Sequence, residues 1–119
     1  MNLTVIKPGF QDLVQDLGRD GYTHLGISPT GAADKASMKI ANLLLGNNVN
    51  DPVIEITLFG GSYSFDCKTT VCFAGSHFPA SIKGKEIPFL KPVAVKQGDI
   101  LTISGSTSGA RCYLAIQNG

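Results

Sequence analysis

The amino-acid sequence predicts a mainly β protein in which one amphipathic helix covers an antiparallel barrel or sandwich. Three observations support this fold class. About nine short segments have the composition of strands, turn signals separate them roughly every eight to twelve residues, and a single stretch carries helical periodicity. The 119 residues are expected to form one domain, because a chain of this length buries roughly two thirds of its unfolded surface in a single core.

The strand-like segments run from the start of the chain to its end. Most of them alternate apolar and polar residues between turn-forming residues. The segment Thr70–Ala74 is nearly all apolar, which predicts a central strand buried on both faces. Cys72 and Cys112 are expected in the core as small hydrophobes, whereas Cys67 is expected to be partly exposed at a strand end. The predicted strands are Leu3–Lys7, Val53–Phe59, Ser62–Asp66, Thr70–Ala74, Pro79–Lys83, Lys85–Phe89, Pro92–Lys96, Ile100–Ser104 and Ala110–Gln117.

One helix is predicted over residues 34–45. Asp34 is a favourable N-cap, and Gly46 is a favourable residue to end the helix at C′. Apolar residues recur at helical spacing between these two positions, which predicts a face that packs against the β structure. The residues predicted for this face are Ala36, Ile40, Ala41, Leu44 and Leu45.

Composition excludes several classes of function. With 10 Lys+Arg against 9 Asp+Glu the net charge is +1, and the cations are scattered, so neither nucleic acid nor a membrane surface is an expected partner. The three cysteines lack the spacing of a zinc site, and no metal site is predicted. Gly84-Lys85 is followed by Glu86, which does not fit a phosphate-binding loop. No leader or membrane span is evident, so a cytoplasmic location is expected.

The segment from Val14 to Asp34 cannot form regular structure. Four glycines recur every three to five residues, and Pro29 interrupts the remainder. A long, polar, glycine-rich segment in a small domain is usually a functional loop with a defined conformation. We therefore expect it to fold over one end of the β structure and to form a ligand site there.

Polar residues of this segment and its neighbours are the candidate site. Glu55 joins them because a lone carboxylate between Ile54 and Ile56 in an apolar strand is seldom without a role. The predicted catalytic residues are Arg19, His24, Asp34 and Glu55, with Arg19 stabilising charge and the others able to transfer protons. The predicted substrate-binding residues are Gly18, Ser28, Thr30, Gly31 and Asn42.

Each catalytic candidate also fits a structural role. Asp34 fits an N-cap, and Arg19 fits an ion pair with Asp16 that holds the loop. His24 fits a residue packed within the loop, and Glu55 fits an acceptor for loop amides. The sequence leaves both alternatives open for all four residues.

Several motifs follow one another in the order and at the distances of a single family signature. They are Val14–Arg19, Gly21-Tyr22, Leu25–Asp34, Ala41–Asn47, Glu55 with Leu58–Gly61, and Gly109–Ala115. On these motifs the chain resembles, over essentially its whole length, the carboxyltransferase-domain proteins known as allophanate hydrolase subunit 2, KipA or the C subunit of the ATP-dependent 5-oxoprolinase.

The resemblance implies a cyclophilin-like antiparallel β-barrel and work in the cytoplasm with a KipI-like partner (the B subunit of 5-oxoprolinase), sometimes with a LamB/YcsF-like subunit. In 5-oxoprolinase the assembly hydrolyses 5-oxoproline to glutamate with ATP. Fused into urea carboxylase, a similar pair of domains transfers a carboxyl group from carboxybiotin to urea. ATP or carboxybiotin would act in the full complex, and no cofactor is expected on this chain alone.

Two departures from the family qualify this expectation. Family members continue beyond the strand that ends near Ala115 into a second barrel, so residues 1–119 are expected to be the N-terminal barrel, with the second barrel absent. The family's usual Thr-Gly-Ala-Asp is here Ala74-Gly75-Ser76-His77, which replaces a carboxylate by an imidazole. A lone first barrel is expected to need a partner or to self-associate.

These expectations give two functional hypotheses. The first is a subunit, or an N-terminal fragment, of a 5-oxoprolinase or carboxyltransferase complex, which forms one wall of the active site and is inactive alone. The alternative is a KipA-like binding module that antagonises a KipI-like kinase inhibitor without catalysis of its own. A fragment without any activity is the remaining possibility.

Overall fold

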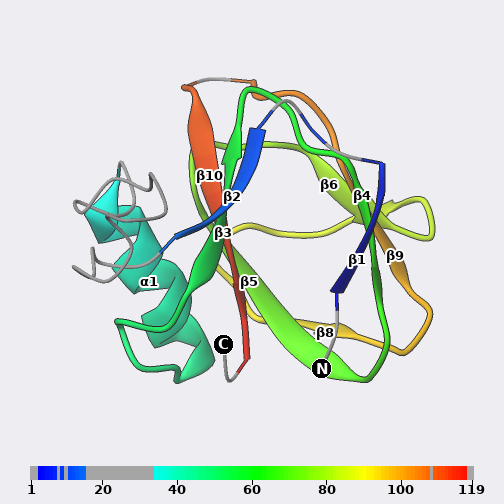
Figure 1. The fold of residues 1–119 in the computed structure, drawn as a ribbon, viewed down its shortest axis with the longest axis horizontal. Helices are drawn as coiled ribbons and strands as arrows, with labels where there is room; N and C mark the ends of the chain where they lie inside the picture. Colours follow the sequence, from blue (N-terminus) through cyan, green and yellow to red (C-terminus); the bar gives the residue numbers. More distant parts are fainter. Residues whose placement is uncertain (1–2, 8, 10, 16–33, 108, 118–119) are drawn as a thin grey trace, which may run out of the picture.

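Two antiparallel five-stranded sheets and one helix make up the described part of the chain, which comprises residues 3–7, 9, 11–15, 34–107 and 109–117 of a computed structural model. Sheet A has the strand order β1-β4-β9-β6-β7, and sheet B has the order β2-β3-β10-β5-β8 (Figure 1). The elements are β1 (Leu3–Lys7), β2 (Gln11–Gln15), α1 (Lys35–Leu45), β3 (Val53–Thr57), β4 (Ser62–Phe65), β5 (Thr69–Gly75), β6 (Ala80–Ile82), β7 (Lys85–Glu86), β8 (Val93–Val95), β9 (Ile100–Ile103) and β10 (Arg111–Ile116).

The mainly β prediction is confirmed, whereas a closed cyclophilin-like barrel is not. Within the described residues the strands pair into two separate open sheets, and β1, β7, β2 and β8 lie at their edges. The main core lies between the sheets, to which both contribute; Tyr63 and Leu101 come from sheet A and Phe73 and Leu114 from sheet B. The alternative of two packed sheets is therefore the arrangement that this part of the chain adopts.

Nine of the ten described strands overlap segments that the sequence predicted, whereas β2 (Gln11–Gln15) was not predicted, and its last two residues lie in the segment Val14 to Asp34 that was expected to lack regular structure. Val71, Cys72, Phe73 and Ala74 of β5 are all buried, as expected for a strand covered on both faces. Cys112 is buried and Cys67 is partly exposed, as predicted, and all three cysteines are reduced. The predicted strand Lys85–Phe89 is too long, because β7 stops at Glu86, two residues before Pro88, where the proline nitrogen cannot donate to a ladder.

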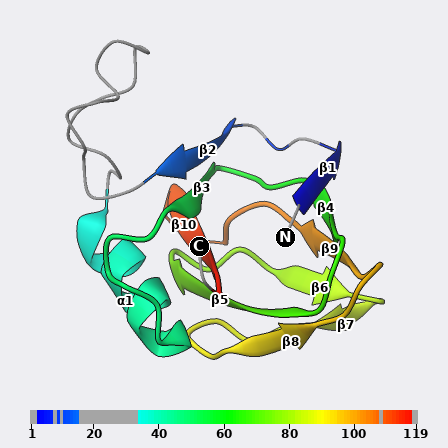
Figure 2. The ribbon, with the colours of Figure 1, turned by 60° about the horizontal axis from the view of Figure 1, so that its bottom comes forward.

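Helix α1 begins and ends at the predicted residues. The side chain of Asp34 accepts a hydrogen bond from the Ser37 amide, and Gly46 adopts a φ of 75° in the left-handed region, which glycine enters without steric cost. Figure 2 shows α1 on the side of sheet B that faces away from sheet A. The helix thus builds a second, smaller cluster against this face.

The predicted apolar face of the helix is partly wrong. The buried residues of α1 are Met38, Ala41, Asn42 and Leu45, whereas Ile40 and Leu44 are 44% and 41% exposed and Ala36 is also exposed. Apolar side chains occur nearly all round this helix, so periodicity alone does not define its packed face. The face is set by contact with sheet B, where the helix packs on a helix-side cluster that includes Val53, Cys72, Ala74, Tyr113 and Ala115.

Candidate functional site

A chain of hydrogen bonds centred on Tyr113 joins the N-terminus of α1 to sheet B. Tyr113 of β10 lies opposite Glu55 of β3 in an antiparallel pair. Its hydroxyl donates to Glu55 Oε2 at 2.6 Å and accepts from the backbone N–H of Asp34 at 2.8 Å. Two of the four predicted catalytic residues, Asp34 and Glu55, are thereby brought to the same place.

Glu55 is a buried carboxylate with charged and hydrogen-bonding neighbours. Its side chain is 6% exposed, and the Nε atom of Arg111, which is 44% exposed, lies 3.9 Å from Oε1. A buried carboxylate is costly unless hydrogen bonds and opposite charge compensate it. Tyr113 at one oxygen and Arg111 near the other provide both forms of compensation, which leaves a carboxylate of fixed orientation beside a partly exposed guanidinium.

Burial keeps the Tyr113 hydroxyl protonated. Desolvation raises the pKa of Tyr113 well above its ordinary value of 10.0, and the hydrogen bond to Glu55 raises this pKa further. A phenol that stays protonated is a permanent donor to the carboxylate. The Tyr113 hydroxyl is therefore the donor in its bond to Glu55.

Asp34 is the N-cap of α1, so the structural alternative for this residue is confirmed. Ser37 donates its backbone N–H to Oδ1 at 3.1 Å and its hydroxyl to Oδ2 at 2.6 Å. The Ser37 hydroxyl and then the Ser37 amide lower the pKa of Asp34 below 3.8, because both bonds favour the ionised form. Its predicted catalytic role stays a prediction.

The cap makes the stability of the protein depend on pH. Because the pKa of Asp34 is lowered on folding, its stabilisation is complete above 3.8 and is lost as the pH falls through the lower folded value. We expect Asp34→Ala to lower the free energy of unfolding by about 1 kcal/mol at neutral pH and by less in acid. Asp34→Asn, which caps without titrating, is the control. Urea unfolding between neutral and acidic pH measures both, and an equal cost of Asp34→Ala at both extremes would contradict the assignment.

Asn42 lies apart from this network, nearer the other end of the helix. Its side chain is fully buried; Nδ2 donates to the carbonyls of Val49 and Asp51, and Oδ1 accepts from Asn47. The described contacts of Asn42 therefore hold the connection from α1 to β3, and its substrate-binding role stays a prediction.

The other predicted site residues lie outside the described residues. They comprise the catalytic candidates Arg19 and His24 and the binding candidates Gly18, Ser28, Thr30 and Gly31. All six precede Asp34 in the chain. Their roles stay predictions.

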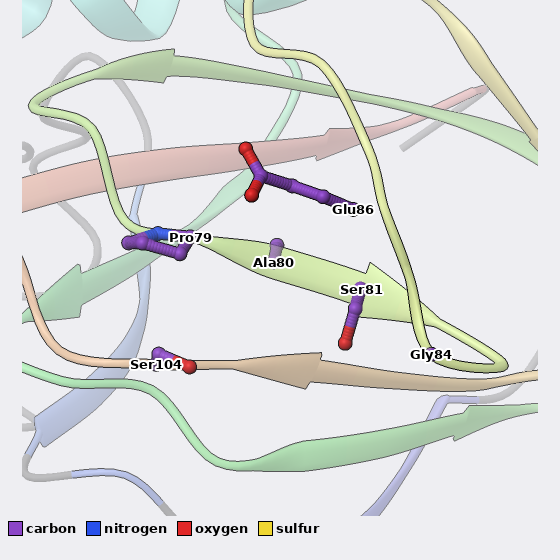
Figure 3. A pocket seen from close by; sticks show the side chains of 6 residues that line it. All are labelled: Pro79, Ala80, Ser81, Gly84, Glu86 and Ser104. Atoms are coloured by element: carbon purple, nitrogen blue, oxygen red, sulfur yellow. The ribbon is translucent and has the colours of Figure 1, made fainter.

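A shallow hollow of about 240 Å³ lies on sheet A, away from the Tyr113 network. Figure 3 shows Ser81, Glu86 and Ser104 around it, with Pro79, Ala80 and Gly84. Beside it, His77, which stands where the family usually has Asp, places Nε2 3.9 Å from Glu86 Oε2 and Nδ1 3.3 Å from Thr107 Oγ1. Of the site candidates that the structure describes, neither Asp34, Asn42 nor Glu55 lines the hollow.

The described residues were also searched for metal-binding groups and for membrane-spanning helices. No group of three or more His, Cys, Asp and Glu side chains in the described ranges could hold a metal ion. No helix in the same ranges is long and apolar enough to cross a membrane.

Sequence reasoning did not assign Arg111 or Tyr113 to the site. Both occur in the motif Gly109–Ala115, and alternation along β10 places them on the same face of sheet B. Their spacing indicated that they are neighbours, but their partner Glu55 depends on the pairing of β10 with β3. That pairing joins segments 58 residues apart, which local patterns do not predict.

Proteins similar to this chain support the resemblance. The chain is 41% identical over 118 residues to the urea amidolyase of Saccharomyces cerevisiae, a match that covers 98% of this chain and 6% of the relative. It is 35% identical over 117 residues to the C subunit of 5-oxoprolinase from Escherichia coli, a match that covers 98% of this chain and 38% of the relative. The chain thus spans well under half of either relative.

A solved structure and a family model agree with these relatives. The crystal structure of the Kluyveromyces lactis urea carboxylase superposes with a TM-score of 0.90 at 37% identity, over 98% of this chain and 10% of that protein. The model of the carboxyltransferase domain, subdomain A and B, matches residues 25–119. This chain therefore belongs to the carboxyltransferase-domain family.

Proposed function

We propose that the chain is a subunit, or the N-terminal part of one, of an amide-processing complex of the ATP-dependent 5-oxoprolinase or biotin-dependent carboxyltransferase type. In this proposal it forms one wall of the active site and is inactive alone. The observation that carries the proposal is the buried Glu55 carboxylate, held by Tyr113 at 2.6 Å beside the half-exposed Arg111. The names of the relatives, a 5-oxoprolinase component and a urea amidolyase, support the reaction class.

These groups suit the chemistry of amides. A carboxylate of fixed orientation can take a proton from an amide N–H or from water. A guanidinium beside it stabilises negative charge that develops on a carbonyl or carboxyl oxygen. We assign the proton-transfer role to Glu55 and the charge-stabilising role to Arg111, together with the predicted Arg19.

The groups on this chain fit a small amide or carboxylate rather than a nucleotide. The described neighbours of Glu55 include the Arg111 guanidinium and the Tyr113 phenol, which suit a carbonyl or carboxyl oxygen, and the run Gly84-Lys85-Glu86 does not fit a phosphate-binding loop. We therefore place ATP or carboxybiotin on the partner's side of the site. When bound there, these groups supply a phosphoryl or a carboxyl group, and Glu55 and Arg111 bind and orient the amide.

The same relatives support a larger assembly. The Escherichia coli relative is by its name one component of a larger enzyme, and the urea amidolyase is far longer than this chain. We propose a KipI-like partner (the B subunit of 5-oxoprolinase), with a LamB/YcsF-like subunit in the 5-oxoprolinase case, in the cytoplasm. The second barrel of the family would complete the site from the other side.

One surface feature favours the alternative, a KipA-like module that binds a KipI-like kinase inhibitor without catalysis. Ile40, Leu43 and Leu44 of α1 are 44%, 61% and 41% exposed and are spaced to share one side of the helix. An exposed apolar stripe of this kind suits a protein contact.

A reconstitution experiment separates the two functions. The chain is purified with a KipI-like protein, a LamB/YcsF-like protein and the missing second half. Turnover is then measured with 5-oxoproline and ATP, or with urea and carboxybiotin. We expect turnover in the complete assembly and its loss with Arg19→Ala. Tight binding of the KipI-like protein without turnover of either substrate favours the binding module instead, and unchanged turnover in Arg19→Ala removes Arg19 from the site.

A further inference from the structure

We infer that Tyr113 is a positioning residue that fixes the Glu55 carboxylate and the start of α1 relative to each other. The inference rests on the proposed role of Glu55. It concerns a residue to which the sequence assigned no role.

Tyr113 is fully buried, and its hydroxyl joins two elements that are far apart in the chain. The Asp34 N–H donates to it at 2.8 Å, and it donates to Glu55 Oε2 at 2.6 Å. A backbone N–H can only donate and an ionised carboxylate can only accept, so the phenol must accept from one and donate to the other. This leaves no alternative orientation for the bridge.

The two hydrogen bonds of the Tyr113 hydroxyl form a bridge whose position is set by the surrounding core. The ring of Tyr113 packs in the helix-side cluster with Met38, Ala41, Cys72 and Ala115. Packing of this kind holds the ring in one rotamer. The hydroxyl is therefore placed by the core, and it in turn places Oε2 of Glu55 and the N-terminal end of α1. A catalytic carboxylate gains from such support because small errors of position cost rate.

A second buried tyrosine shows that packing alone does not require this arrangement. Tyr63 is 1% exposed and lies in the main core, and its hydroxyl accepts from the amide of Gly61, two residues away, at 3.2 Å. That bond is local and joins β4 to its own preceding turn. Tyr63→Phe is thus a matched control, because it removes one buried hydroxyl from the other cluster without touching Glu55.

The experiment compares Tyr113→Phe with Tyr63→Phe, first in the chain alone. NMR follows the hydrogen-exchange rate of the Asp34 amide and the side-chain carboxyl ¹³C resonance of Glu55. We expect Tyr113→Phe to speed exchange at Asp34 by on the order of tenfold and to move the Glu55 resonance, whereas Tyr63→Phe changes neither. If neither observable responds to Tyr113→Phe, Tyr113 does not position Glu55.

The second part of the experiment measures the kinetics of both variants in the assembled complex. We expect Tyr113→Phe to lower kcat by on the order of tenfold or more with a much smaller change in KM, because the carboxylate is misplaced rather than removed. An equal loss of kcat in both variants would mean a merely structural role and would overturn the inference. If the wild-type complex shows no turnover, the proposed function fails, while the NMR arm still tests the positioning.

A measurement on the wild-type protein tests the bridge even when the Tyr113→Phe variant does not fold. A hydrogen-bonded phenol buried at 0% exposure should give an observable hydroxyl proton with a nuclear Overhauser effect to the Asp34 amide. We expect this signal in the wild type and its displacement in Glu55→Gln. Its absence in the folded wild-type protein would count against the bridge.

Discussion

Glu55→Gln is expected to lower kcat of the assembled complex by on the order of 100-fold or more, the usual size of a general acid–base contribution. Glutamine keeps the shape of the side chain and can accept the hydrogen bond from Tyr113. It cannot take up a proton as a carboxylate does. The change therefore tests the chemistry of the carboxylate with little change in packing, and steady-state kinetics with the reconstituted complex measures it.

The matched control for this variant is Glu86→Gln. Glu86 is a carboxylate on sheet A whose side chain is 68% exposed, and it lies outside the proposed machinery. We expect its kcat to stay within about twofold of the wild type, since exposed surface charges contribute little. If Glu55→Gln behaves like Glu86→Gln while both proteins are folded, Glu55 does not take part in the chemistry.

Phe73→Ala is expected to lower the free energy of unfolding by about 3–5 kcal/mol, the usual cost of deleting a buried phenyl ring. Phe73 is fully buried in β5 between the two sheets. It also stacks on Phe89, with ring centroids 4.8 Å apart and planes 10° from parallel. Because small domains have a free energy of unfolding of only about 5–15 kcal/mol, we expect this variant to be only marginally stable.

Phe59→Ala provides the comparison for that prediction. Phe59 carries the same side chain at 46% exposure, so we expect a cost of about 1 kcal/mol or less. Urea denaturation followed by circular dichroism gives both values under identical conditions. Similar losses for the two variants would show that Phe73 does not occupy the centre of the core.

The sequence alone defined the helix and most of the strands of this protein, although it did not predict β2. Strand alternation, turn residues and the caps Asp34 and Gly46 act within a few residues of one another, so their effects can be recognised locally. Cys112 lies in the main core, as predicted, and Tyr113 lies in the helix-side cluster, because successive side chains of a strand point to opposite faces. The family signature was recognised from motifs of the same local kind.

Tertiary structure alone decided the features that depend on which segments meet. Periodicity predicted Ile40, Leu44 and Leu45 for the packed face of α1, whereas contact with sheet B buries Leu45 together with Met38, which was not predicted. The hydrogen bonds of Tyr113 join residues 79 and 58 positions away, and they follow from strand register. Helix caps and side-chain alternation depend on residues close together in the sequence. Strand register and helix packing depend on contacts throughout the core. The sequence therefore determined the parts and the family of this protein, and the folded structure determined how Glu55 is held.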